Sequence, residues 1–348
     1  MDKKRCIYID FIKTVAIISV LAIHASAPGF TSYDFKNINY IVSVLYGSLV
    51  RFAVPVFIMS SGAIFLNEEK EITIKNIYKK YIPRIIAALL LFALFYESVP
   101  LIFTYIKTGI IDKGLFKNGI TNLFTLNTHF HLYYLYIIVI LYALTPVLKS
   151  FLKGADKKRE EYLIVFLFIF SSLVPFLRNL FSLNNFGGMT TQYDINLTYG
   201  MLLYFLLGHY FSKYDVKEKV YKLIIFGGIL GFIITFFGTI IMSQVKNYSC
   251  QLFLEGMYPN IFLMAVAIFN FSKYHNFKHE KIYVNISKSS FLIYLIHDFY
   301  NIVFRSIGLS IDIIPAVFSI PLLVIINFVL SYITYLIAKR IPLLNKII

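Results

Sequence analysis

Apolar runs of about 18 to 25 residues recur along the whole chain, and they constrain its fold more than any other feature. A helix of about 20 apolar residues crosses the ~30 Å hydrocarbon layer of a membrane. Charged residues make up only 15% of the 348 residues, and the mean hydropathy is +0.72. Soluble domains carry about 25% charged residues. The sequence therefore predicts an all-α fold, a polytopic bundle of transmembrane helices.

About ten spans are expected, with both termini on the cytoplasmic side. The apolar runs lie near residues 8–27, 41–66, 82–106, 131–149, 162–182, 198–212, 221–242, 257–272, 289–307 and 314–338. With this topology, 24 of the 33 Lys and Arg residues fall in cytoplasmic segments and 7 in outer loops or flanks. The positive-inside rule predicts such a split, which also explains the net charge of +15 without nucleic-acid binding. A single transmembrane domain over residues 1–348 is expected, with no appended extracytoplasmic domain.

The first span, YIDFIKTVAIISVLAIHASA, carries three ionisable groups, Asp10, Lys13 and His24. Lys13 and His24 are eleven residues apart, so they share a helix face about 16 Å apart along the axis. Asp10 lies one turn before Lys13 and can pair with it. Such groups inside a membrane usually mark a functional cavity. Three alternatives stay open: a solvated Asp10 at the interface, a Lys13 that snorkels to the cytoplasm, and a His24 that only packs.

The second span contains RFAVPVFIMSSG, in which Arg51 lies well inside the apolar run. Pro55 is expected to bend the helix nearby. An arginine buried beside such a bend predicts a cavity lined by freed backbone carbonyls.

Further cations and histidines lie near the two membrane surfaces. Lys80 and Arg84, in KKYIPRI, are expected at the inner surface, where they could contact lipid headgroups or form a phosphate site. His131, in HFHLYYLY, is expected at the outer mouth, and His297, in SFLIYLIHD, in mid-membrane. Two histidines two residues apart make a poor metal site on their own, so no metal is expected.

Together these stretches resemble the acyltransferase-3 family of integral membrane acyltransferases, which includes bacterial O-acetyltransferases of surface polysaccharides. The family's first helix is similar in placing an Asp, a cation and a His where this chain has Asp10, Lys13 and His24. Its second, fourth and ninth helices resemble RFAVPVFIMSSG, HLYYLY and FLIYLIH. The chain departs from the family in having Lys13 in place of arginine, and Tyr81 at the first position of an R-x-x-R pattern.

The resemblance implies transfer of an acyl group, most often acetyl, from cytoplasmic acyl-CoA to a hydroxyl of a surface or lipid-linked glycan. Such an enzyme would lie in the bacterial cytoplasmic membrane, beside glycan-biosynthesis proteins. Histidine titrates near neutral pH, so His24 is expected to be the general base. The other expected roles are donor guidance or oxyanion stabilisation by Lys13 and Arg51, phosphate binding by Lys80 and Arg84, and acceptor binding or proton relay by His131 and His297.

A transporter or flippase for an anionic or glycan substrate is the competing hypothesis. In that case Lys13, Arg51 and His24 would line a transport path. Thioester cleavage by the purified protein separates the two functions, because a transporter releases no free CoA.

Overall fold

The computed structural model describes residues 6–125, 127–181 and 200–347 of the chain. Helices account for 82% of the structure, and no strand occurs among the described residues. The expected all-α class is thus confirmed. The basic residues Lys3, Lys4 and Arg5 and the expected span ends at residues 182 and 198 lie outside the described residues.

The chain forms two compact units, each assembled from two separate stretches. Unit 1 comprises Met1–Glu71 and Val147–Ile333, and unit 2 comprises Ile72–Pro146 and Thr334–Ile348. The boundaries between them fall inside α8 (Tyr133–Gly154) and inside α16 (Ala316–Ala338). The expectation that residues 1–348 act as one domain stays a prediction.

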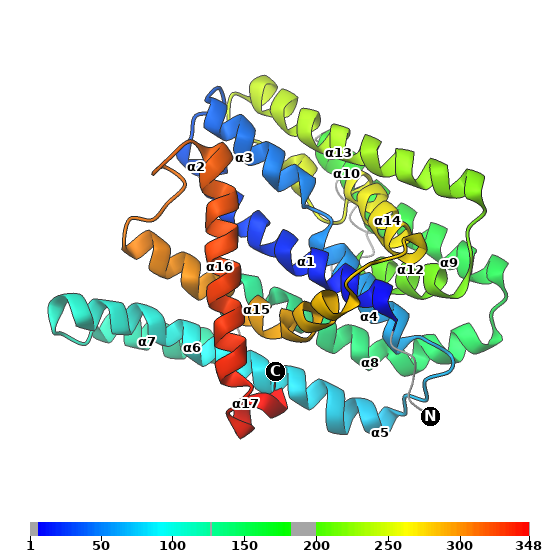
Figure 1. The fold of residues 1–348 in the computed structure, drawn as a ribbon, viewed down its shortest axis with the longest axis horizontal. Coiled ribbons are helices and arrows are strands. Elements are labelled where there is room, and N and C mark those ends of the chain that lie inside the picture. Colours follow the sequence, from blue (N-terminus) through cyan, green and yellow to red (C-terminus); the bar gives the residue numbers. More distant parts are fainter. Residues whose placement is uncertain (1–5, 126, 182–199, 348) are drawn as a thin grey trace. The chain divides into compact units, whose positions relative to one another are not determined.

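Unit 1 is built around the first helix. Its helices are α1 (Ile7–Ser26), α2 (Gly29–Ser32), α3 (Ile38–Leu49), α4 (Ala53–Phe65), α9 (Lys157–Phe168), α10 (Val174–Leu180), α12 (Met201–Lys213), α13 (Glu218–Lys246), α14 (Pro259–Tyr274), α15 (Glu280–Ser306) and most of α16. Helix α1 packs against α3, α4, α14 and α15 (Figure 1). Twelve of its 20 residues are buried. The helix that carries the polar stripe is therefore the core helix of this unit.

Close packing of α4 against α12 depends on two glycines. A Cβ atom added at Gly62 would lie 1.9 Å from the carbonyl oxygen of Phe205, and one added at Gly208 would lie 1.9 Å from that of Met59. Each glycine thus lets its helix rest directly on the backbone of the other. Because α4 also packs on α1, this contact helps to position the core helix.

Eight helical segments among the described residues are long and apolar enough to cross a membrane. They are Ile7–Ser32, Ile38–Phe65, Ile74–Thr108, Lys113–Gly154, Lys157–Leu180, Glu218–Lys246, Leu252–Tyr274 and Ala316–Ala338. The other two expected spans are also helices, α12 and α15. Helix α12 has 13 residues and so extends about 20 Å, which is shorter than the hydrocarbon layer. Helix α15 has 27 residues and carries Lys288, Asp298 and Arg305, which make it more polar than the eight.

The outward faces of these helices fit a lipid environment. Helix α13 exposes Phe226, Ile229, Ile233, Phe237 and Ile241, a row of large apolar side chains along its length. A water-soluble surface rarely presents so continuous an apolar row. The chain is a multi-pass membrane protein.

Unit 2 centres on a long helix. It contains α5 (Ile74–Asn76), a π-helical turn at Ile77–Tyr81, α6 (Ile82–Thr108), α7 (Lys113–Thr125), a 3-10 turn at Phe130–Leu132, the beginning of α8, the end of α16 and α17 (Pro342–Ile347). Helix α6 packs against α7 and α17 and ends at Gly109, whose positive φ of 68° suits glycine.

Candidate active site

Helix α1 places its three ionisable residues as the spacing predicts, because it runs unbroken from Ile7 to Ser26. Asp10, in the first turn, is only 5% exposed, so it is not a solvated helix end. The hydroxyl of Thr14 donates to the backbone oxygen of Asp10 at 2.9 Å and lies 3.2 Å from the carbonyl oxygen of Tyr283 on α15. Lys13 and His24 are both half-buried.

The far end of α1 brings His24 against α15. The ring centroids of His24 and His297 are 4.8 Å apart, with the ring planes tilted by 52°. The side chain of Asp298 joins them, since the nitrogen and oxygen atoms of the three residues lie within 4.8 Å of one another. His297 and Asp298 are buried, at 0% and 2% exposure. Two histidines expected separately from the sequence therefore meet, together with a carboxylate.

The tautomer of His297 follows from its hydrogen bond. Its Nδ1 lies 2.7 Å from the carbonyl oxygen of Tyr294. A carbonyl oxygen only accepts hydrogen bonds, so Nδ1 carries the hydrogen. In the neutral ring the lone pair is then on Nε2. Helix α15 thus fixes both the orientation and the basic nitrogen of this imidazole.

A buried network between α15 and α16 holds Asp298 in place. The amide of Asn301 donates to Asp298 at 2.9 Å, and the amide of Asn327 donates both to Asn301 and to the carbonyl oxygen of His297, each at 2.9 Å. Ser331 lies 3.0 Å from the side-chain oxygen of Asn327. Such satisfied polar networks in a low dielectric rigidify the groups that they connect.

Sequence reasoning missed three members of this network, Asp298, Asn301 and Asn327. A signal for the first was present, because Asp298 directly follows His297 in the quoted stretch SFLIYLIHD. Asn327 is a lone amide in a strongly apolar span, which is also a recognisable sign of a polar contact between helices.

A cavity of about 140 Å³ lies beside His24. Its polar lining comes from Ser32, Asn301, Arg305, Ser310 and Asp312. These residues belong to the C-terminal end of α15 and to loops that the expected topology places on the outer side. A hydroxyl compound entering from outside would therefore meet His24 at the wall of this cavity.

The loop at the rim of the cavity is fixed by a tyrosine. The hydroxyl of Tyr33 donates to the carbonyl oxygen of Ile311 at 3.3 Å. Burial, followed by the hydrogen bond and the negative charge of Asp312, raises the pKa of Tyr33 to about 12. The hydroxyl therefore stays protonated at physiological pH and remains available as a donor.

The helix break near Arg51 differs from the prediction. Helix α3 ends at Leu49 and α4 begins at Ala53, so the break precedes Pro55, which lies in the first turn of α4. Proline suits a first turn, where its missing N–H is not needed. The Nε of Arg51 donates to the carbonyl oxygen of Leu254, in the turn between α13 and α14.

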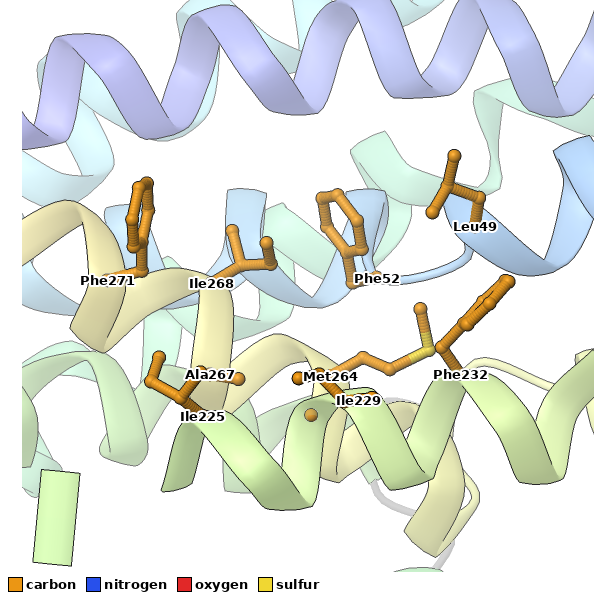
Figure 2. A pocket seen from close by; sticks show the side chains of 10 residues that line it. Leu49, Phe52, Ile225, Ile229, Phe232, Met264, Ala267, Ile268 and Phe271 are labelled. Carbon is orange, nitrogen blue, oxygen red and sulfur yellow. The ribbon is translucent and has the colours of Figure 1, made fainter. Parts of the chain in front are cut away.

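The cavity beside this break is apolar, and the prediction of a carbonyl-lined cavity there is wrong. Its volume is about 370 Å³. Figure 2 shows Leu49 and Phe52, which flank the break, across the cavity from Phe232. The remaining lining residues are Ile225, Gly228, Ile229, Met264, Ala267, Ile268 and Phe271. The positive charge of Arg51 is directed to Leu254, and apolar side chains cover the freed backbone.

Unit 2 holds the expected phosphate-binding cations. Lys80 lies in the π-helical turn and Arg84 in the first turn of α6, and both are exposed. The Lys80 ammonium is 5.8 Å from the ring centre of Tyr81, and the Nε of Arg84 donates to the carbonyl oxygen of Ile347 at 2.9 Å. Irregular turns of this kind occur frequently at functional sites.

The histidines before α8 form a cluster within unit 2. The Nδ1 atoms of His129 and His131 are 2.7 Å apart, so one ring donates and the other accepts. The ring of Tyr96 stacks on His129 with centroids 4.4 Å apart and meets the edge of His131 at 4.8 Å. His131 is only 1% exposed, so it is fixed in one orientation.

Comparison with known proteins identifies one family. Residues 7–336 match the family model described as an acyltransferase domain. The match extends from the first turn of α1 to the last turn of α16. No curated protein and no solved structure matches the chain.

Proposed function

The chain belongs to the acyltransferase-3 family, and from that premise we propose that it transfers an acetyl group from cytoplasmic acyl-CoA to a hydroxyl of a cell-surface or lipid-linked glycan. The observation that carries the proposal is the meeting of His24 with the buried pair His297 and Asp298, beside a cavity with a polar lining. Acyl transfer to a hydroxyl needs a base next to an acceptor site, and this arrangement supplies both.

His24 acts as the general base in this proposal. It removes the proton from the acceptor hydroxyl while the oxygen attacks the thioester carbonyl carbon. The carbon–sulfur bond then breaks, and the CoA sulfur leaves as a thiolate that takes up the proton. Asp298 stabilises the positive charge that develops on the imidazole, as a buried carboxylate does in other acyl-transfer sites. His297 holds a lone pair toward the same region and can relay the proton.

Lys13 acts on the donor. It lies about 16 Å along α1 from His24, too far for both to contact the same carbonyl group. We therefore assign Lys13, positioned by Asp10, to the path of the donor from the cytoplasm. Lys80 and Arg84 bind the donor phosphates, Arg51 lies along the donor path, and His131 contacts the acceptor.

Release of free CoA by the purified protein tests the proposal. Acetyl-CoA is added to the protein in detergent with a membrane glycan extract, and free thiol is measured over time. The wild type should release CoA, and His24→Ala should reduce the rate by about 100-fold or more. His275→Ala, which changes an exposed histidine outside the site, should match the wild type.

Two results would contradict the proposal. A wild-type protein that releases no CoA above a protein-free blank favours a transporter instead. Equal rates for His24→Ala and His275→Ala would exclude His24 as the base.

A further inference from the structure

The outer end of α15 carries a cation on the same face as the catalytic carboxylate. Asp298, Asn301 and Arg305 follow one another at positions i, i+3 and i+7, which lie on one side of a helix. Arg305 is therefore about 10 Å along the axis from Asp298. Arg305 and His24 line the same cavity of about 140 Å³.

The two charged groups of this cavity differ in what they contact. Asp312 lies 3.4 Å from the hydroxyl of Ser310 and affects the pKa of Tyr33 through a hydrogen bond. The guanidinium of Arg305, by contrast, makes no hydrogen bond or ion pair with any residue that the structure describes. The protein thus uses its carboxylate to hold the loop and presents its guanidinium to the cavity.

We propose that Arg305 binds an anionic group of the acceptor, a phosphate or a carboxylate, close to the hydroxyl that His24 deprotonates. This inference rests on the proposed function and adds the chemical class of the acceptor. A guanidinium binds phosphates and carboxylates through two parallel hydrogen bonds, which also orient the ligand. The acceptor is accordingly an anionic glycan or polyol polymer, not a neutral polysaccharide.

The size of the cavity fits this assignment. Its volume equals that of about five water molecules in the liquid, so it can hold one hydroxyl-bearing fragment but not several sugar rings. Recognition of a long polymer must then depend on a few strong contacts at the mouth. A charged contact at the rim meets that need.

Selectivity between acceptors tests the assignment. The protein is reconstituted in phosphatidylcholine vesicles and supplied with acetyl-CoA and one of two probes, a synthetic glycerol phosphate trimer or neutral triglycerol. A second pair, a glucuronic acid disaccharide and its neutral glucose counterpart, separates carboxylate from phosphate recognition. The measured quantity is the ratio of kcat/KM for the anionic probe to that for the neutral probe.

Arg305→Gln should lower this ratio about tenfold or more for at least one pair, because charge-assisted hydrogen bonds of that strength are lost. Arg305→Lys should give an intermediate ratio, since the charge remains and the fork is lost. Lys246→Gln, which removes a cation from the last turn of α13 outside the cavity, should leave the ratio unchanged.

Several outcomes would overturn the inference. An unchanged ratio in Arg305→Gln excludes anion recognition. A loss seen only when anionic lipid is added shows a lipid-headgroup contact, and a lowered thermal stability with an unchanged ratio shows a role at the helix C-terminus.

A binding measurement keeps this test independent of catalysis. Binding of a fluorescently labelled glycerol phosphate trimer and of the labelled glucuronic acid disaccharide is titrated without acetyl-CoA. Wild type should bind one of them at least about tenfold more tightly than Arg305→Gln. Equal affinities for both would refute the role of Arg305, whereas tight binding without any release of CoA would refute the proposed function alone.

Discussion

Replacing Gly62 with alanine should destabilise unit 1 by pushing α4 away from α12. The added Cβ would lie 1.9 Å from the carbonyl oxygen of Phe205 and 2.7 Å from its carbonyl carbon. Carbon and oxygen atoms that are not bonded stay about 3.3 Å apart or more. The two helices would therefore have to separate locally by about 1.4 Å. The obstacle is backbone, so no side-chain rotation relieves it.

The expected loss is large for a single methyl group. A gap of about 0.5–1 Å already removes a quarter to a half of the dispersion attraction between facing atoms. Overpacking costs about 1–3 kcal/mol when neighbours can shift, and the facing backbone here places Gly62→Ala near about 3 kcal/mol. At about 2–4 °C per kcal/mol, Tm should fall by about 6 °C or more.

Thiol labelling during heating measures this change. The chain has two free cysteines, Cys6, which is exposed, and Cys250, which is buried. A thiol-reactive dye should label the first at once and the second only on unfolding. Gly154→Ala is the control, because no atom lies within 4 Å of its added Cβ. A Gly62→Ala protein that melts within about 1 °C of Gly154→Ala would refute the reasoning.

Three further results are expected. Lys13→Arg should retain most glycan acylation in cells and Lys13→Met should lose nearly all of it, whereas a snorkelling anchor would leave Lys13→Met fully active. Lys80→Ala with Arg84→Ala should raise the KM for acetyl-CoA about tenfold or more, and an unchanged donor titration would reduce the pair to lipid contacts. The hydrogen bond from Lys213 lowers the pKa of Glu68 below 4.5, so the Tm advantage of wild type over Glu68→Gln should be full at higher pH and shrink as pH falls below about 4.5; an advantage independent of pH would contradict this.

Helical spacing was sufficient to predict the part of the site that lies on one helix. The positions of Asp10, Lys13 and His24 on α1 follow from 3.6 residues per turn, because the helix is unbroken. The membrane-spanning character followed from hydropathy for the same reason, since it depends on local composition. His297 was also recognised as a buried polar residue in an apolar span.

Contacts between distant helices could not be predicted in this way. The pairing of His24 with His297 depends on α1 packing against α15, which no local pattern specifies. Arg51 is a sharper case, because its partner is a backbone carbonyl 203 residues further along the chain. A carbonyl group has no sequence signature. Without that partner in view, the freed backbone near Pro55 was expected to line a polar cavity.

The transfer of label across the membrane tests the central claim most directly. Sealed inside-out vesicles from cells that make the wild-type protein are given acetyl-CoA labelled in the acetyl group, which reaches only the cytoplasmic face. Label should accumulate in the glycan inside the vesicles in proportion to the CoA released outside, and His24→Ala vesicles should show about 1% of that label or less. Glycan labelled equally in wild-type and His24→Ala vesicles, or CoA release without labelled glycan, would contradict acyl transfer by His24 to an outward-facing acceptor.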